Sequence, residues 1–237
     1  MHRKTKQKVF KMKVLATNGS PRKQWNTATL LNKALEGAAS NGAQTELVHL
    51  YDLNFKGCTS CYECKLKNGP SFGRCTYKDE LSPVLGKIET ADALILGAPI
   101  YLGTVPGVMK SFLERLATPY LVYDADGNLI SLFPRKIPTG FIHTMGGDEE
   151  HAKAMGVENH IRGNEMMLKM IFGSVESLAV ADTLHVDDYS KYVMPFDAEE
   201  KMKRHKEVFP LGCEKAFEMG VKLAQEMAST AKMPDEK

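Results

Sequence analysis

The segment most diagnostic of the fold reads Lys13-Val-Leu-Ala-Thr-Asn-Gly-Ser-Pro-Arg-Lys-Gln-Trp-Asn-Thr-Ala-Thr-Leu-Leu31. Its short apolar run, residues 14–16, predicts a strand buried in a parallel sheet. A polar turn follows at residues 18–21, where Gly19 can adopt backbone angles that other residues avoid. Asn26 or Thr27 is then a good N-cap, and apolar residues at helical spacing follow it. The segment therefore predicts a strand, a polar loop and a helix N-terminus.

The predicted loop gathers several groups that bind anions. Backbone N–H groups at a helix N-terminus, together with Ser20, Arg22, Asn26 and Thr27, form a cradle suited to a phosphate monoester. The glycine patterns of the Walker loop and of the G-x-G-x-x-G fingerprint are not found here. The alternative is an ordinary strand-to-helix turn with a surface arginine. The crowding of small polar groups in one turn favours the anion site.

The composition indicates one α/β domain with additions. The chain has 237 residues, 43% of them hydrophobic and 25% charged. Its formal net charge of +2 argues against a nucleic-acid partner. Basic residues concentrate at positions 1–11, which we interpret as a flexible solvated tail before a domain at 12–230. We expect a cytoplasmic protein without membrane attachment, because neither a transmembrane stretch nor a signal-peptide core is apparent.

Strands and helices are predicted to alternate along the chain. After the first unit, strands are expected at 45–50, 93–97, 137–143 and 177–183. Helices are expected at 79–89, 104–116, 149–170, 199–205 and 213–227, with an insertion-like loop at 120–135. This alternation predicts a doubly wound five-stranded parallel sheet in the flavodoxin-like order 2-1-3-4-5. Ligands bind such sheets at the carboxyl ends of the strands, beside the switch point between strands 1 and 3.

Two further loops are predicted at that edge. Pro99-Ile-Tyr-Leu-Gly103 leaves a buried strand, where Gly103 permits close approach to a flat ring and Tyr101 offers an aromatic face. Thr144-Met-Gly-Gly147 follows the fourth strand, and its N–H groups could stabilise negative charge. Plain turns are the alternative for both loops. His143 is interpreted as structural, and Cys213 as a core thiol.

These segments resemble the flavodoxin-like NAD(P)H-dependent FMN reductases, near their iron–sulfur flavoprotein branch. The resemblance is carried by Gly-Ser-Pro-Arg and Asn-Thr of the first loop, by residues 97–103 and by the cysteines, and it covers about residues 13–147. It implies that the first loop holds the FMN phosphate and that residues 100–103 contact the isoalloxazine. It also implies NAD(P)H as co-substrate and a homodimer or homotetramer. The expected FMN-binding residues are Ser20, Arg22, Asn26, Thr27, Ala28, Pro99, Ile100, Tyr101, Leu102, Gly103, Thr144, Met145, Gly146 and Gly147.

Four cysteines form a separate motif in the loop 57–76. Cys58, Cys61 and Cys64 have C-x2-C-x2-C spacing, and Cys75 follows after a longer gap than iron–sulfur flavoproteins usually show. Three thiolates from such a tight loop can reach one [4Fe–4S] cluster, with a fourth from further along the chain. Zinc also suits four thiolates, and four free thiols are the third alternative. All three interpretations stay open at this point.

The chemistry of the chain is expected to reside in its cofactor. No Ser-His-Asp set or carboxylate pair stands out, so catalytic side chains are not assigned. The first hypothesis is an FMN-dependent oxidoreductase that passes electrons from NAD(P)H to a quinone, a nitro compound, a flavin or a protein. A single-electron carrier is the second, although carrier flavodoxins are markedly acidic and this chain is not. A zinc-bound structural module is the third.

Overall fold

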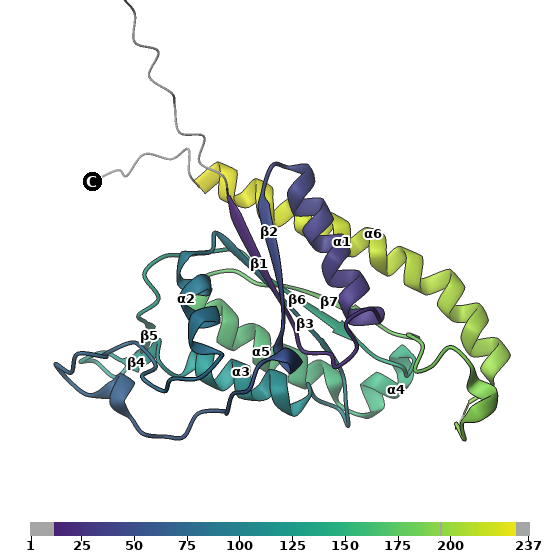
Figure 1. The fold of residues 1–237 in the computed structure, drawn as a ribbon, viewed down its shortest axis with the longest axis horizontal. Helices are drawn as coiled ribbons and strands as arrows, with labels where there is room; N and C mark the ends of the chain where they lie inside the picture. Colours follow the sequence, from purple (N-terminus) through teal and green to yellow (C-terminus); the bar gives the residue numbers. More distant parts are fainter. Residues whose placement is uncertain (1–11, 195, 231–237) are drawn as a thin grey trace, which may run out of the picture.

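The computed structural model describes residues 12–194 and 196–230 (Figure 1). The predicted basic tail at 1–11 lies outside these residues. The described chain forms a five-stranded parallel sheet covered by helices on both faces. Within the described ranges, every helix is too short or too polar to cross a membrane.

The central sheet has the order β2-β1-β3-β6-β7, which confirms the predicted flavodoxin-like order. Adjacent strands are parallel throughout, and Ala16 of β1 lies between Leu47 of β2 and Ile95 of β3. The central strand β3 is buried along nearly its whole length, as its continuous apolar run predicts. The strands are β1 (Lys13–Asn18), β2 (Gln44–His49), β3 (Ala93–Pro99), β6 (Thr139–Thr144) and β7 (Glu176–Val180).

Two hydrophobic layers pack the helices against the sheet. One face carries α1 (Asn26–Ser40) and the long α6 (Ala198–Thr230). The other carries α2 (Ser82–Thr90), α3 (Gly107–Ala117) and α5 (Val157–Phe172). Short 3₁₀ turns occupy Leu50–Asp52, Glu63–Lys65 and Tyr189–Lys191. Figure 1 shows α1 and α6 side by side above the strands.

Glycines allow α1 and α6 to pack with their backbones close together. A Cβ atom added to Gly220 would lie 1.8 Å from the Ala34 carbonyl oxygen, and one on Gly37 would lie 2.0 Å from that of Phe217. Any larger residue would force the two helices apart. Cys213 packs beside this layer as a partly buried thiol, close to its predicted role.

Four expectations about helices and loops are corrected. The predicted helix 149–170 is divided into α4 (Glu149–Ala154) and α5, because Gly156 turns the chain with φ 68°. Helices 199–205 and 213–227 are the single α6, which continues through Pro210. The loop 120–135 contains a hairpin of β4 (Leu121–Tyr123) and β5 (Leu129–Ser131). Helices α2 and α3 begin at residues 82 and 107, three residues later than expected, since Asp79 and Thr104 belong to preceding turns.

Candidate functional site

Three loops meet at the carboxyl edge of the sheet and enclose a cavity of about 400 Å³. They follow β1, β3 and β6, so the segments that the sequence predicted separately are neighbours in the fold. The segment after β7 closes the remaining side. The lining residues are Ser20, Arg22, Trp25, Asn26, Thr27, Pro99, Ile100, Tyr101, Leu102, Thr144, Gly146, Thr183, Leu184 and His185.

Four of the predicted FMN-binding residues lie outside this lining. Ala28 is fully buried in the first turn of α1, and Met145 is buried at the end of β6. Gly103 lies at the turn beyond the cavity, and Gly147 lines a neighbouring cavity of about 760 Å³. These residues shape the loops around the cavity.

The first loop ends at an uncapped helix N-terminus. Helix α1 begins at Asn26, and no side chain among the described residues caps it. As in any helix, the N–H groups of the first turn have no acceptor within the helix. Thr27, which belongs to this turn, is buried. Asn18 Oδ1 accepts the Ser20 N–H at 2.9 Å, and Ser20 Oγ accepts the Arg22 N–H at 3.2 Å. These turns hold the loop open around the helix end, which is the arrangement that an anion requires.

The segment after β7 is the part of the site that sequence reasoning missed. The Leu184 carbonyl accepts hydrogen bonds from Trp25 Nε1 at 2.9 Å and from Asn26 Nδ2 at 2.7 Å. The His185 carbonyl accepts one from the Arg22 guanidinium. The donors predicted to hold a phosphate thus face a row of oxygen acceptors. The sequence offers one indication of this contact: Trp25, the single tryptophan of the chain, lies between the predicted ligands Arg22 and Asn26.

The loop after β3 is a tight and strained turn. Tyr101 and Thr104 exchange both backbone hydrogen bonds, at 2.7 and 3.1 Å. Between them, Leu102 and Gly103 have φ values of 52° and 82°. Leu102 is 96% exposed, so a bulky apolar residue is held in an unfavourable backbone conformation at the tip of the turn. Such strain is often found at ligand sites.

The loop after β6 is tied to its neighbours on both sides. The Thr144 carbonyl accepts the Ile100 N–H at 2.8 Å, and Thr144 Oγ1 lies 2.7 Å from Thr27 Oγ1. Lys201 of α6, which is buried, donates to the Gly146 carbonyl. A Cβ atom at Gly146 would lie 2.0 Å from His185 Nε2, so a larger residue there would require the His185 ring to move. The loop is therefore held by α1, β3, β7 and α6 together.

His143 lies beneath this loop, where it has no access to solvent. Its ring is stacked on Phe141 with centroids 4.0 Å apart, and neither ring nitrogen has a hydrogen-bond partner among the described residues. Burial lowers the pKa of His143 to about 3. The imidazole is neutral at physiological pH, which agrees with its exclusion from the proton donors.

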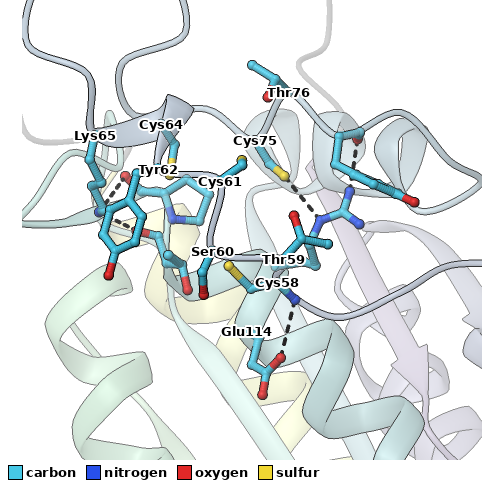
Figure 2. Close-up of a pocket in the computed structure, with 14 residues that line it drawn as sticks. Cys58, Thr59, Ser60, Cys61, Tyr62, Cys64, Lys65, Cys75, Thr76 and Glu114 are labelled. Carbon is cyan, nitrogen blue, oxygen red and sulfur yellow. Dashed lines mark hydrogen bonds between the residues drawn. The ribbon is translucent and has the colours of Figure 1, made fainter.

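The four clustered cysteines line a second cavity, of about 290 Å³ (Figure 2). All four are free thiols. Ser60 and Tyr62 have positive φ values of 54° and 59°, so the chain reverses between successive cysteines. The Gly73 N–H donates to the Cys64 carbonyl at 3.0 Å. This bond closes the long gap after Cys64 and returns the chain, so that Cys75 joins the other three.

Charged side chains border the cysteine cavity. Lys65 donates to the carbonyls of Thr118, Pro119 and Leu121, which fixes the loop to the end of α3. The Glu114 carboxylate accepts the Cys58 N–H at 3.3 Å. Burial raises the pKa of the Cys64 thiol. Among the residues described, no group of three or more His, Cys, Asp or Glu is arranged to hold a metal ion.

The cysteine cavity and the cavity at the sheet edge share no lining residue. The loop 99–103 precedes the first turn of α3, whereas Glu114, Thr118 and Pro119 lie at its end. Helix α3 has 11 residues, which corresponds to about 16 Å. The protein therefore has two separate candidate sites along one helix.

Comparison with known families finds a match in the N-terminal part of the chain. Residues 12–128 match the model of the NADPH-dependent FMN reductases, which confirms the predicted family resemblance. The matched region contains the first two loops and all four cysteines, and it ends before Thr144.

Curated proteins similar to this chain are named iron–sulfur flavoproteins. An iron–sulfur flavoprotein of Archaeoglobus fulgidus is 41% identical over 104 residues, which are 44% of this chain and 48% of the relative. One of Methanocaldococcus jannaschii is 36% identical over 104 residues, 44% of this chain and 51% of that protein. The chain thus spans about half the length of the curated relatives it matches.

Solved structures share the fold at low sequence identity. The NAD(P)H:quinone oxidoreductase from Methanothermobacter marburgensis has a TM-score of 0.64 and 17% identity, over 90% of this chain and 100% of that one. An FMN-dependent NADH-azoreductase from Bacillus anthracis, in complex with FMN, has a TM-score of 0.60 and 16% identity, over 90% and 99%. These likenesses establish the flavodoxin-like fold.

Proposed function

We propose that this protein is an FMN-dependent oxidoreductase that takes hydride from NADH or NADPH and passes electrons to an acceptor. The observation that carries the proposal is the uncapped N-terminus of α1, which faces a cavity lined by Arg22 and by the loops after β3 and β6. The match of residues 12–128 to NADPH-dependent FMN reductases supports it. Quinones, nitro compounds, flavins and proteins are the candidate acceptors.

The residues of the cavity fit FMN by their chemistry. Arg22 and Asn26 offer charged and neutral N–H donors around the α1 N-terminus, which suits a phosphate monoester. Tyr101 and the strained turn offer an apolar wall and backbone groups to a flat ring. Bound FMN would supply the hydride and electron chemistry, and the protein would supply position and electrostatics. Because His143 is neutral and buried, proton exchange is expected with solvent at the open cavity.

The reaction is tested with anaerobic protein loaded with FMN. Adding NADH or NADPH in separate samples should bleach the flavin absorbance, and steady-state turnover with a quinone should show ping-pong kinetics, because donor and acceptor would use one ring face in turn. Flavin that stays oxidised at millimolar NADH and NADPH, yet is reduced by a protein partner, would support the electron carrier instead.

The cysteine cavity favours a second cofactor, a [4Fe–4S] cluster. A cluster binds each thiolate to a different iron, so its ligands surround a cavity instead of meeting at one ion. The four cysteines line one cavity, and the Gly73–Cys64 hydrogen bond brings Cys75 back to the other three across the long last gap, which supports the proposal. Curated relatives that match 104 residues of this chain are named iron–sulfur flavoproteins.

Iron and acid-labile sulfide analysis tests this second cofactor. Anaerobically prepared protein should contain about four irons per chain. The variant Cys61→Ala should lose them, while Cys213→Ala, which alters a thiol outside the cavity, should keep them. Iron near zero in all three proteins, with FMN present, would leave a plain flavin reductase with four free thiols.

A further inference from the structure

Arg115 is a charged residue in the lining of the cysteine cavity, and its side chain contacts one of the four thiols directly. Its side chain is 2% exposed, although it lies in the last turns of α3 beside a surface cavity. Asp79 is its counter-ion, with Asp79 Oδ2 2.8 Å from Arg115 Nη1. A buried ion pair seldom adds net stability relative to apolar residues. Its position against the cysteines therefore calls for a functional reason.

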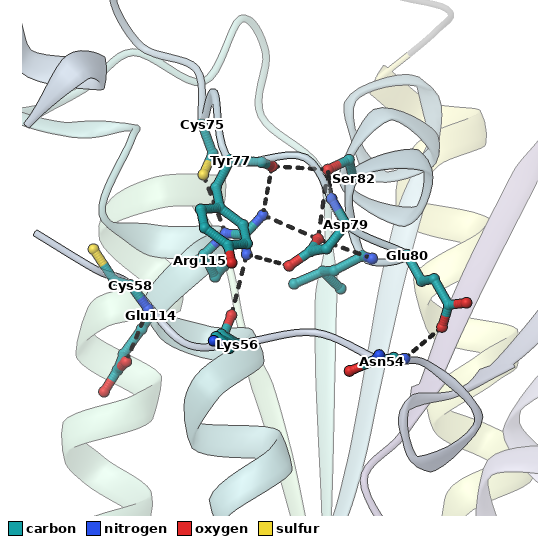
Figure 3. A network of polar contacts seen from close by, with 11 residues as sticks. Asn54, Lys56, Cys58, Cys75, Tyr77, Asp79, Glu80, Ser82, Glu114 and Arg115 are labelled. Atoms are coloured by element: carbon teal, nitrogen blue, oxygen red, sulfur yellow. Dashed lines mark hydrogen bonds and ion pairs between the residues drawn. The ribbon is translucent and has the colours of Figure 1, made fainter. Parts of the chain in front are cut away.

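The hydrogen bonds of Arg115 use all of its donor groups (Figure 3). Nη1 donates to Asp79 Oδ2 and to the Lys56 carbonyl at 3.1 Å. Nη2 donates to the Tyr77 carbonyl at 3.0 Å and to Asp79 Oδ1 at 3.3 Å. The one N–H of Nε points to Cys75 Sγ at 3.1 Å. A planar guanidinium with five fixed donors can make this set of bonds, whereas lysine cannot.

These contacts join the two ends of the cysteine loop. Lys56 precedes Cys58 by two residues, and Tyr77 follows Cys75 by two residues. Arg115 therefore fixes the entry and the exit of the loop to one point on α3 while it holds the sulfur of Cys75. Asp79 orients the guanidinium so that its Nε–H faces the sulfur.

We propose that Arg115 is a positioning residue that sets Cys75 as the fourth ligand of the cluster and raises the cluster's reduction potential. The inference rests on the proposed [4Fe–4S] site. A bound cluster would carry one more negative charge in its reduced form, and the sulfurs of its cysteine ligands, Cys75 among them, would share that charge. An N–H donor and a positive group at a ligand sulfur stabilise that added charge, so they favour the reduced form. The electron comes from the flavin or from a chemical reductant in the test.

The test compares midpoint potentials of the cluster in reconstituted, FMN-containing proteins. Arg115→Lys keeps the charge but loses the Nε donor, and it should shift the oxidised-to-reduced equilibrium about tenfold toward the oxidised form, a fall of about 59 mV. The matched control is Arg135→Lys, whose arginine forms a similar pair with Asp92 at 2.9 Å away from the cysteines. It should keep the wild-type potential.

A second variant keeps the test decisive if Arg115→Lys folds poorly. The double variant Arg115→Gln/Asp79→Asn removes both charges together, so no buried charge is left unpaired. It should bind FMN normally and also show a lowered potential. The proposal would be overturned if a folded variant that holds its cluster kept the wild-type potential. It would also be overturned if both variants unfolded, because Arg115 would then have a structural role. Wild-type protein that takes up no iron would instead show that the cluster itself is absent.

Discussion

Arg22 and Lys23 are neighbouring cations in the first loop, yet the structure gives them different roles. Arg22 lines the cavity at the sheet edge, whereas Lys23 pairs with Asp52 at 2.7 Å and both of these side chains are about half exposed. Losing a charge-assisted contact to a phosphate costs about 1.5–3 kcal/mol. Arg22→Ala should therefore bind FMN roughly tenfold to a hundredfold more weakly, by fluorescence titration of the apoprotein. Lys23→Ala is the control, and equal affinities in the two variants would contradict the phosphate assignment.

Asp182 is a second residue whose contacts make a measurable prediction. Lys201 Nζ lies 3.1 Å and Arg204 Nη2 2.7 Å from its carboxylate. Burial alone would raise the pKa of Asp182, but the hydrogen bonds and charges of these two cations hold it below its usual range. A carboxyl group with a lowered folded-state pKa stabilises the fold above its unfolded pKa, and that stability is lost as the pH falls through the folded value.

The Asp182→Asn variant should therefore be less stable by about 3 kcal/mol at pH 7, because it leaves Lys201 buried without a counter-ion. The difference from wild type should shrink as the pH falls below about 4, the usual value for aspartate. Urea unfolding at pH 7 and pH 3 measures it. Glu176→Gln, which removes an exposed pair with Lys222, should have little effect. A difference that does not vary with pH would mean that the carboxylate charge is not responsible.

Local chemistry explains which site residues the sequence could predict. Ser20, Arg22, Asn26 and Thr27 belong to one turn, and a polar turn at a helix start is recognisable without any tertiary information. The role of the carbonyls of residues 184 and 185, which face these side chains, could not be predicted from the sequence. Every residue has a carbonyl group, and only the tertiary fold determines where it points. The return of the chain from Cys64 to Cys75 could not be predicted from the sequence either, because it depends on one backbone hydrogen bond, from the Gly73 N–H to the Cys64 carbonyl.

At the scale of elements, the sequence predicts the strands of the central sheet and their order better than the breaks between helices. Continuous apolar runs such as residues 93–97 are fully buried strands wherever they occur in a parallel sheet. Helix ends depend on contacts from elsewhere. Two helices were expected at 199–205 and 213–227, yet Phe209, Cys213 and Ala216 pack against the α1 layer and one helix continues through Pro210. Tertiary packing outweighs the cost of the proline.

The crossing of α1 and α6 gives a prediction at this scale. Gly220→Ala would place a methyl group 1.8 Å from the Ala34 carbonyl, so the helices must separate. The variant should lose about 1–3 kcal/mol of unfolding free energy. Gly163→Ala in α5 is the matched control, because nothing lies within 4 Å of its Cβ position. It should gain about 0.4–1 kcal/mol. Thermal unfolding of both variants measures the contrast, and a stable Gly220→Ala would mean that the helices are not closely packed.

At the scale of the whole molecule, α3 lies between the two candidate sites. The helix begins after the strained turn at residues 101–104 and ends at the cysteine cavity. Because the sites share no lining residue, damage to the cysteine site should not reach the flavin site directly. A helix with a buried apolar stripe is also a rigid spacer, so the two sites should keep a constant separation.

Because the two cavities are separate, changing a cysteine should leave flavin reduction unaffected. Cys61 is exposed and does not line the cavity at the sheet edge, so Cys61→Ala should bind FMN with wild-type affinity and should be reduced by NADH or NADPH at the wild-type rate. Only electron passage beyond the flavin should be lost. Anaerobic stopped-flow reduction of the flavin, beside a reductive titration that counts the electrons each chain accepts, separates the two steps. The variant should accept fewer electrons at an unchanged rate of flavin reduction. A slower flavin reduction in the variant would mean that the cysteine loop shapes the flavin site, and that the two sites along α3 act as one.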